Sequence, residues 1–231
     1  MDDVERFSGC TFSFYQSQCF EKLTQEQMDY LNAHSVKIKY RRGEMISKQG
    51  GFVSHVMYME KGLAKVFLEN GDNTLVLRVI PNGSFLGLAS VAEANSTFPY
   101  SSQAYVDSEI RQIEIAAFRK MMEDNTDFVK EIINILSTNS IQIYGRFFCL
   151  TYKQAFGRLA DILLCLSCRI FNTTEFSLPL SRKELAELSG MSSETVIRML
   201  KEFKEEGLIQ MDGKSISVLD MERLKQISET G

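Results

Sequence analysis

The sequence predicts an α+β chain with an N-terminal antiparallel β-roll of the jelly-roll type, a long helix and a C-terminal winged helix-turn-helix. Three observations support this prediction. Short strand-like runs separated by turns fill residues 36–115, an apolar repeat of coiled-coil spacing follows over 126–150, and two short helical patterns meet at Gly190. We place the domain boundaries at 1–125, 126–150 and 151–231.

The composition is that of a globular chain. Its 231 residues, 44% of them hydrophobic, suffice for one large or two modest domains. No uninterrupted apolar run reaches the roughly 20 residues that a membrane helix needs. The N-terminal stretch MDDVERFSGC is acidic, whereas a secretory signal is basic and then apolar. We therefore expect a soluble, cytoplasmic protein that does not contact a membrane.

The N-terminal part combines one short helix with many strands. Residues 20–34 are expected to form the helix, with Thr24 as its N-cap. Short alternating or β-branched runs then follow, and turn signals such as Asn70-Gly71-Asp72 separate them. These runs lie at 36–40, 55–62, 63–70, 74–80 and 103–115. Many short strands at this spacing are typical of an antiparallel sandwich or barrel.

The long helix shows apolar positions that step by four and three residues over three heptads. These positions are Val129, Ile133, Leu136, Ser140, Ile143, Phe147 and Leu150. We interpret them as a dimer interface, because outer positions such as Lys130, Glu131 and Gln142 are polar. A long helix that packs only on its own β-domain is the alternative.

Two capped helices form the next unit. Ser181 and Glu184 have the spacing of a capping box, and Gly190 is suited to the left-handed turn that ends the first helix. Ser192 is expected to cap the second helix, whose apolar stripe would face the core. That stripe consists of Val196, Met199, Leu200 and Phe203.

The second helix also has an outer stripe, about 200° around its axis from the first. It contains Glu194, Ile197, Arg198 and Lys201. Beyond the helix, two β-runs flank Asp212-Gly213, which predicts a hairpin with a type I′ turn. Helix, turn, helix and hairpin together form a winged helix-turn-helix. The net charge of −4 is no obstacle to DNA binding, because a local basic patch suffices.

With these parts in place, the chain resembles the Crp/Fnr family of bacterial transcription regulators over nearly its whole length. GEMISKQG (43–50), GSFLGL (83–88) and QIEI (112–115) resemble its cyclic-nucleotide-binding β-roll. GRLADILL (157–164) and SRKELAELSGMSSETVIRMLKEFKEEGLI (181–209) resemble its DNA-binding domain. The resemblance implies a homodimer that binds a palindromic, TGA-containing operator in double-stranded DNA. It also implies RNA polymerase as a partner if the protein activates transcription.

The resemblance and the outer stripe together suggest how DNA is read. Arg198 can donate two hydrogen bonds to guanine O6 and N7, and Glu194 can accept one from cytosine N4. Ser193 stands where cyclic-AMP-dependent members carry Arg, so we expect half-sites nearer TTGA than GTGA. Ser192, Thr195, Lys201 and the wing's Lys214 are expected to contact phosphate, and Arg182 adds local positive charge. The predicted DNA-binding residues are Arg182, Ser192, Ser193, Glu194, Thr195, Arg198, Lys201 and Lys214.

Departures from the family pattern concern the effector. The Gly-Glu pair that holds the ribose in cyclic-AMP-binding members becomes Gly87-Leu88, and the Arg-Ser pair that grips the phosphate becomes Tyr100-Ser101. Leu88 cannot accept a hydrogen bond and Tyr100 has no positive charge, so we expect cyclic AMP not to bind. The family's adenine-contacting Thr-Ser falls at Ile143-Tyr144. The predicted effector-pocket residues are Phe85, Gly87, Leu88, Tyr100, Ser101, Ile143 and Tyr144.

Other sensors of the same fold remain as alternatives. An iron–sulfur cluster needs about four thiolates, and no Cys lies between Cys19 and Cys149, which argues against one. A haem- or redox-dependent sensor stays open, with His34, His55 or a Met as a possible axial ligand beside apolar pocket residues. These apolar residues can equally fill the core of the roll. A cupin-like enzyme needs several His or carboxylate ligands, and the chain has two His. We therefore expect no catalytic residues and no metal site, and the effector stays unidentified.

Overall fold

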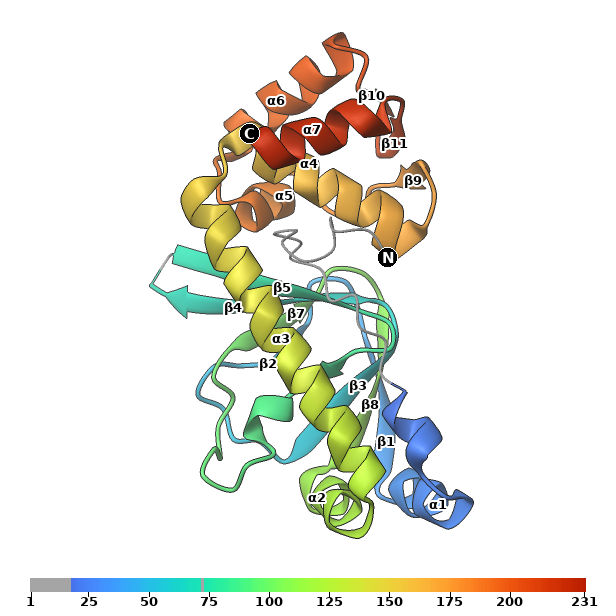
Figure 1. Cartoon of the computed structure of the whole chain (residues 1–231). Helices are drawn as coiled ribbons and strands as arrows, with labels where there is room; N and C mark the ends of the chain where they lie inside the picture. Colours follow the sequence, from blue (N-terminus) through green and yellow to red (C-terminus); the bar gives the residue numbers. More distant parts are fainter. Residues whose placement is uncertain (1–17, 72) are drawn as a thin grey trace. The chain divides into compact units, whose positions relative to one another are not determined.

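The computed structural model describes residues 18–71 and 73–231, which form two compact units. We call the first the β-domain; its described part comprises residues 18–71, residue 73 and residues 78–141. We call the second the C-terminal unit; its described part comprises Thr74–Leu77 and Gln142–Gly231. Figure 1 shows the strands of the first and the helix cluster of the second. Both α3 (Thr126–Tyr152) and β5 (Asn73–Pro81) contribute residues to the two units.

The β-domain begins with a single 3₁₀ turn (Cys19–Lys22) and α1 (Gln25–Ala33). The expected helix over 20–34 is therefore interrupted. Thr24 caps α1 as predicted, because its Oγ1 accepts from the Gln27 N–H at 3.3 Å while Gln27 Oε1 accepts from the Thr24 N–H at 3.0 Å. This reciprocal box starts a new helix at Gln25.

Eight strands form two antiparallel sheets, as the turn spacing predicted. They are β1 (Ser35–Tyr40), β2 (Met45–Ser47), β3 (His55–Lys61), β4 (Leu63–Asn70), β5 (Asn73–Pro81), β6 (Phe85–Leu86), β7 (Ser101–Ala104) and β8 (Ser108–Glu114). One sheet has the order β1-β8-β3-β6 and the other β2-β7-β4-β5. The single strand expected over 103–115 is thus two, because the chain leaves one sheet after Ala104 and enters the other at Ser108.

Helices close the β-domain. α2 (Ile115–Asp124) follows β8 directly, lies beside α1 in Figure 1, and leads into α3. Phe118 of α2 and Phe128 of α3 are fully buried, and their rings meet edge to face with centroids 5.3 Å apart. Ile132, one turn further along α3, is also buried. The first half of α3 therefore packs on its own β-domain through aromatic and branched side chains.

The C-terminal unit contains the predicted helix-turn-helix and wing. Its elements after α3 are α4 (Ala155–Cys165), a π-helical turn (Leu166–Phe171), β9 (Glu175–Ser177), α5 (Arg182–Ser189), α6 (Ser193–Glu205), β10 (Ile209–Asp212), β11 (Ser215–Val218) and α7 (Met221–Thr230). The three strands pair in the order β10-β11-β9. Among the described residues, none of the helices has both the length and the apolar character of a membrane span.

Candidate nucleic-acid interface

The first helix of the motif, α5, begins and ends as its sequence predicts. Ser181 Oγ accepts from the Glu184 N–H at 3.2 Å, and Glu184 Oε2 accepts from the Ser181 N–H at 2.6 Å. Gly190 then adopts a left-handed φ of 64°. A Cβ at this glycine would lie 3.0 Å from Leu150 Cδ2 of α3. Two independent constraints therefore require glycine at position 190: the left-handed turn and the close contact with the Leu150 side chain.

The second helix, α6, separates an inner from an outer face. Ser192 caps it, since its Oγ accepts from the Thr195 N–H at 3.2 Å. The four predicted inner residues are all buried, as expected: Val196, Met199, Leu200 and Phe203. Glu194, Arg198 and Lys201 lie exposed on the outside. The cap fixes where α6 begins, and the buried apolar stripe fixes which side of it faces the core. The charged stripe is therefore the face that α6 presents to solvent.

The charged side chains Glu194 and Arg198 on the outer face of α6 are available to bind another molecule. Hydrogen bonds from the backbone N–H of Glu194 and from the Ser192 side chain lower the pKa of Glu194, which therefore stays an ionised acceptor at neutral pH. Arg198 Nε lies 3.9 Å from Glu202 Oε1, and within the described part of the chain no ion pair links Arg198 to Glu194. The exposed pair with Glu202 is worth only about 0.3–0.5 kcal/mol and can exchange for a base contact.

The wing places Lys214 at the tip of an exposed hairpin. Asp212 pairs with Ser215, so the loop residues are Gly213 and Lys214. The hairpin is confirmed, but the predicted type I′ turn is wrong. That turn needs positive φ at both loop residues, and only Gly213, at 58°, has it. Lys204 Nζ donates to the Met211 backbone oxygen at 3.3 Å and so ties α6 to the wing.

The remaining predicted DNA-binding residues lie around these two features. Ser192, Lys201 and Lys214 are exposed, whereas Ser193 and Thr195 are half-buried in the first turn of α6. Arg182, at the start of α5, is half-buried too, and its partial burial lowers its pKa. All eight predicted DNA-binding residues therefore belong to one unit and have at least partial access to solvent.

Two arginines that the sequence reasoning missed hold the turn of the motif. Arg146 of α3 donates from Nη2 to the Leu188 backbone oxygen at 2.7 Å, and Arg158 of α4 donates from Nε to the Ser189 backbone oxygen at 2.8 Å. Both oxygens belong to the last turn of α5, which lacks helical partners. The end of α3 is thereby fastened to the turn between α5 and α6.

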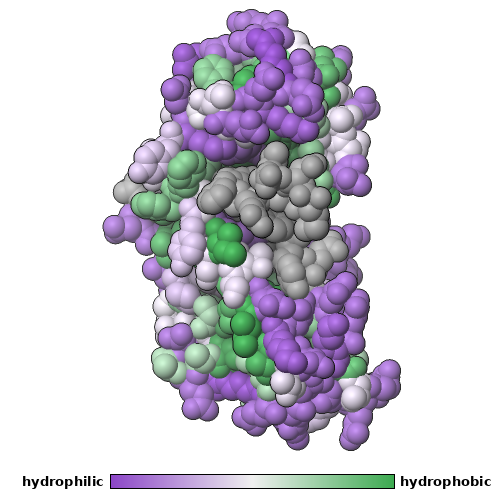
Figure 2. Space-filling model, viewed as in Figure 1, coloured by the Kyte–Doolittle hydropathy of each residue, from purple (hydrophilic) through white to green (hydrophobic). Residues whose placement is uncertain are grey.

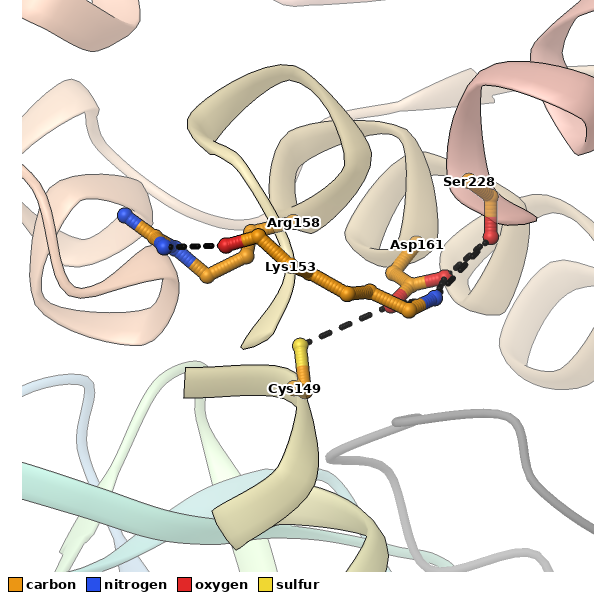
Figure 3. A network of polar contacts seen from close by, with 5 residues as sticks. All are labelled: Cys149, Lys153, Arg158, Asp161 and Ser228. Atoms are coloured by element: carbon orange, nitrogen blue, oxygen red, sulfur yellow. Dashed lines mark hydrogen bonds and ion pairs between the residues drawn. The ribbon is translucent and has the colours of Figure 1, made fainter. Parts of the chain in front are cut away.

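A buried polar network anchors the junction of α3 and α4, as Figure 3 shows. Asp161 accepts two hydrogen bonds from Lys153 Nζ, at 2.7 and 2.9 Å, and another from Ser228 Oγ of α7. Cys149 Sγ lies 3.5 Å from Asp161 Oδ2. Burial, followed by the Asp161 charge, raises the pKa of Cys149 to about 11, so this thiol is unreactive at neutral pH. Because the Asp161 carboxylate bonds both the Lys153 ammonium and the Ser228 hydroxyl, the network stiffens the junction of α3 with α4 and α7.

α3 has two adjacent faces, of which the sequence reasoning found one. Along the predicted seam, Ile133 is 54% and Phe147 70% exposed, Leu136, Ser140 and Ile143 are also exposed, and Val129 and Leu150 are half-buried. One residue earlier, a second face is buried within each unit. It consists of Phe128, Ile132, Ile135, Gln142, Arg146 and Cys149. An offset of one residue is about 100° around a helix, so α3 can pack on its own chain and still offer the seam to a partner.

The predicted effector-pocket residues are only partly brought together. Tyr100 and Gly87 do meet, because the Gly87 N–H donates to the Tyr100 hydroxyl at 3.0 Å. Phe85 and Leu88 are buried in the β-domain core. Ser101 is engaged by Glu69 and by the Gln49 N–H, at 2.9 and 3.0 Å. Ile143 and Tyr144 belong to the other unit and are exposed.

A cavity of about 520 Å³ lies elsewhere in the β-domain. Its walls come from the segment 88–93, α2 and α3, and they include the seam residues Val129 and Leu136. Leu88 is the one predicted pocket residue that lines it. Neither His34 nor His55 does: His34 Nδ1 lies 2.8 Å from the Tyr30 backbone oxygen, and His55 Nδ1 lies 2.7 Å from Ser54 Oγ. Met122 of α2 does line the cavity, so of the axial ligands considered a methionine is the one placed there.

The cupin-like enzyme, another of the alternatives, requires a cluster of metal-binding side chains. Within residues 18–71 and 73–231, no three His, Cys, Asp or Glu side chains gather closely enough to hold a metal ion. Cys19 is buried in the β-domain core, and Cys10 lies outside the described residues.

Comparisons with known proteins agree with this architecture. A family profile described as a Crp-like helix-turn-helix domain matches residues 157–227, and one described as a cyclic nucleotide-binding domain matches residues 37–125. The first match spans α4 to α7 and therefore includes the whole recognition motif. The second runs from residue 37, within β1, through the other strands of the β-domain to α2.

Individual relatives cover most of the chain. It is 26% identical over 205 residues to the transcriptional activator protein Anr of Pseudomonas aeruginosa, covering 86% of this chain and 83% of the relative. It is 23% identical over 200 residues to the cAMP-activated global transcriptional regulator Vfr of the same species, covering 84% and 94%. Among solved structures, FixK2 from Bradyrhizobium japonicum matches with a TM-score of 0.78 at 18% identity, covering 85% and 98%. At this level of identity, the similarity to the FixK2 structure shows a common fold and nothing more specific.

Proposed function

Because the chain belongs to the Crp/Fnr family of transcription regulators, we propose that it binds a palindromic DNA operator as a homodimer and reads each half-site with α6. The observation that supports this most directly is the outer face of α6. There an ionised Glu194 and an Arg198 without a strong ion-pair partner stand one turn apart near the helix N-terminus, the end that enters the major groove in such motifs.

The expected base contacts follow from hydrogen-bonding chemistry. Arg198 donates two hydrogen bonds to guanine, and Glu194 accepts from cytosine N4, which selects G·C pairs within a TGA-type half-site. Ser193 adds no guanidinium, so a TTGA half-site is favoured over GTGA. Ser192, Thr195, Lys201 and Lys214 contact phosphate and set register and salt dependence. Arg182 adds local positive charge.

The dimer is proposed to form through the exposed seam of α3. Figure 2 shows hydrophobic side chains along the stretch of surface that α3 follows in the view of Figure 1. Large apolar side chains at heptad spacing with half or more of their surface exposed, such as Ile133 and Phe147, are typical of a surface that a partner covers. A parallel pairing of two α3 helices places two copies of α6 for two half-sites one helical turn, about 34 Å, apart.

The β-domain is proposed as a sensor that does not bind cyclic AMP. Leu88 replaces the ribose acceptor and is buried in the core, and the Ser101 hydroxyl already bonds Glu69. We propose a cytoplasmic location and no catalytic activity, which are the properties of the family. RNA polymerase is the proposed protein partner if the regulator activates transcription.

Fluorescence anisotropy tests the DNA-binding function. A duplex with two inverted TTGA half-sites should bind the wild-type protein, with affinity falling steeply as salt rises. Replacing the guanine in both half-sites should weaken wild-type binding but change the affinity of Arg198→Ala little. Arg223→Ala is the matched control, because this exposed α7 arginine pairs with Glu206 and lies outside the predicted interface. Equal affinity for both duplexes in the wild-type protein would exclude the proposed readout.

A further inference from the structure

The cavity of about 520 Å³ in the β-domain has the size of a small-molecule site, since such sites measure about 300–1,000 Å³. Its walls come from one unit only, because the segment 88–93, α2 and the first half of α3 all belong to the β-domain. Gly87, Tyr100 and Ser101, where the family resemblance places the effector, do not line it. The cavity is therefore a separate place for a ligand.

The interior of this cavity is apolar and rests on the domain core. Leu88 and Ile132 belong to the buried core, and Val91 and Met122 pack against it. One polar contact ties two walls together, since Arg119 Nε of α2 donates to the Val91 backbone oxygen at 2.8 Å. The cavity is thus preformed, and an apolar ligand does not have to order its walls. The apolar lining residues are Leu88, Ala89, Val91, Ala92, Met122, Val129, Ile132 and Leu136.

Three charged residues complete the lining: Glu93, Arg119 and Glu123. Both glutamates are exposed, so their carboxylates belong to the mouth of the cavity and not to its interior. Within the part of the chain that the structure describes, neither side chain has a hydrogen bond or an ion pair, whereas Glu60 and Glu69 of the same domain each pair with a lysine. Two negative charges against one positive charge leave the mouth with a net negative charge.

We propose that this cavity binds an apolar molecule that carries a positively charged amino group. The hydrocarbon part packs against Leu88, Met122 and Ile132, and the ammonium group stays at the mouth beside Glu93 and Glu123. An isolated charge is costly to bury, and the mouth offers the ammonium donors both carboxylates and water. The Arg119 guanidinium opposes a cation, but the two carboxylates outweigh it.

A second copy of the chain is the other candidate occupant, because Val129 and Leu136 belong both to the cavity wall and to the proposed seam of α3. The charges at the mouth favour the amine. The seam of a second copy consists of apolar side chains and Ser140, so it offers no positive charge to Glu93 and Glu123. A protein that binds no amine would instead point to the second copy.

Isothermal titration calorimetry of the full chain with octylammonium, 1-octanol and octanoate tests the proposal, because these probes share one tail and differ in charge. Octylammonium should bind about tenfold more tightly than octanoate, with the uncharged alcohol between them. Glu93→Gln combined with Glu123→Gln should remove this preference. Glu21→Gln combined with Glu26→Gln is the matched control, because these two exposed carboxylates of the same domain do not line the cavity. The control should keep the preference.

Met122→Trp fills the cavity and should abolish the binding of all three probes. Met45→Trp, at an exposed position of β2 outside the cavity, should bind them as the wild type does. If Met122→Trp fails to fold, the glutamine variants still decide, because they change exposed side chains only. The proposal is overturned if the wild type binds no octylammonium at millimolar concentration or binds all three probes equally. It is also overturned if Met122→Trp keeps full binding, or if the paired variant of Glu93 and Glu123 keeps the preference.

Discussion

The two units of the molecule differ in where their polar groups find partners. In the C-terminal unit, Asp161 in the interior is fully paired, and the open charges of Glu194 and Arg198 face outward. In the β-domain, Arg78 Nη1 is buried without a hydrogen-bond partner, as are both amide atoms of Gln142 in the C-terminal unit, whereas surface charges of the β-domain such as Lys37 and Glu60 pair at 2.7 Å. The outward charges of the C-terminal unit are suited to reading another macromolecule, whereas the charges of such a pair on the β-domain surface are already engaged within the chain.

The largest expected effect concerns α3, the helix that joins the two units. Replacing both Leu136 and Ile143 with Asp buries unpaired charges in the proposed seam, which costs several kcal/mol of dimer stability. Sedimentation at micromolar concentration should then show monomer. Lys130→Ala together with Thr138→Ala, at outer positions of the same helix, should leave the dimer intact. If the double Asp variant stays dimeric, the proposed seam is not the dimer interface.

The next prediction concerns the paired interior of the C-terminal unit. Asp161→Asn leaves the Lys153 ammonium buried without its counter-charge, so we expect about 3–5 kcal/mol lower stability by urea unfolding. Glu222→Gln, which breaks an exposed pair with Lys225, should cost less than about 1 kcal/mol. Similar losses for the two variants would mean that burial of the Asp161 network adds little to the unit.

A smaller effect is expected at the wing. Lys214→Ala removes one proposed phosphate contact, so it should weaken binding to all DNA sequences alike and reduce the salt slope by about one unit. Anisotropy at several salt concentrations measures this slope. A loss confined to one DNA sequence would instead assign Lys214 to base recognition.

No effect is expected from cyclic AMP. Calorimetry should show no binding at micromolar concentration, because Leu88 cannot accept from a ribose hydroxyl and is buried in the core. A micromolar or tighter dissociation constant would contradict the proposed loss of this ligand. This β-domain would then bind the same ligand as the β-domains of cyclic-AMP-activated relatives.

The two units also differ in how much their sequences reveal. Ser181, Gly190 and Ser192 act on their own neighbours, so caps and turns predicted α5 and α6 closely. The β-domain depends on pairings distant in sequence. The change of sheet after Ala104 and the short strands β2 and β6 have no local signal.

The candidate site residues show the same contrast. Glu93 and Glu123 were each visible as acidic residues, but their common cavity was not, because residues distant in sequence line it. The second face of α3 was missed because Gln142 and Arg146 interrupt its apolar repeat.

Binding-site selection on the wild-type protein and Arg198→Ala, with Arg223→Ala as the control, tests the central claim most directly. The wild type and the control should both select inverted half-sites of TTGA type. Arg198→Ala should lose about 1–3 kcal/mol of affinity and its preference at one guanine in each half-site, while the rest of the motif persists. If Arg198→Ala selects the same motif as the wild type, α6 is not the element that reads the operator.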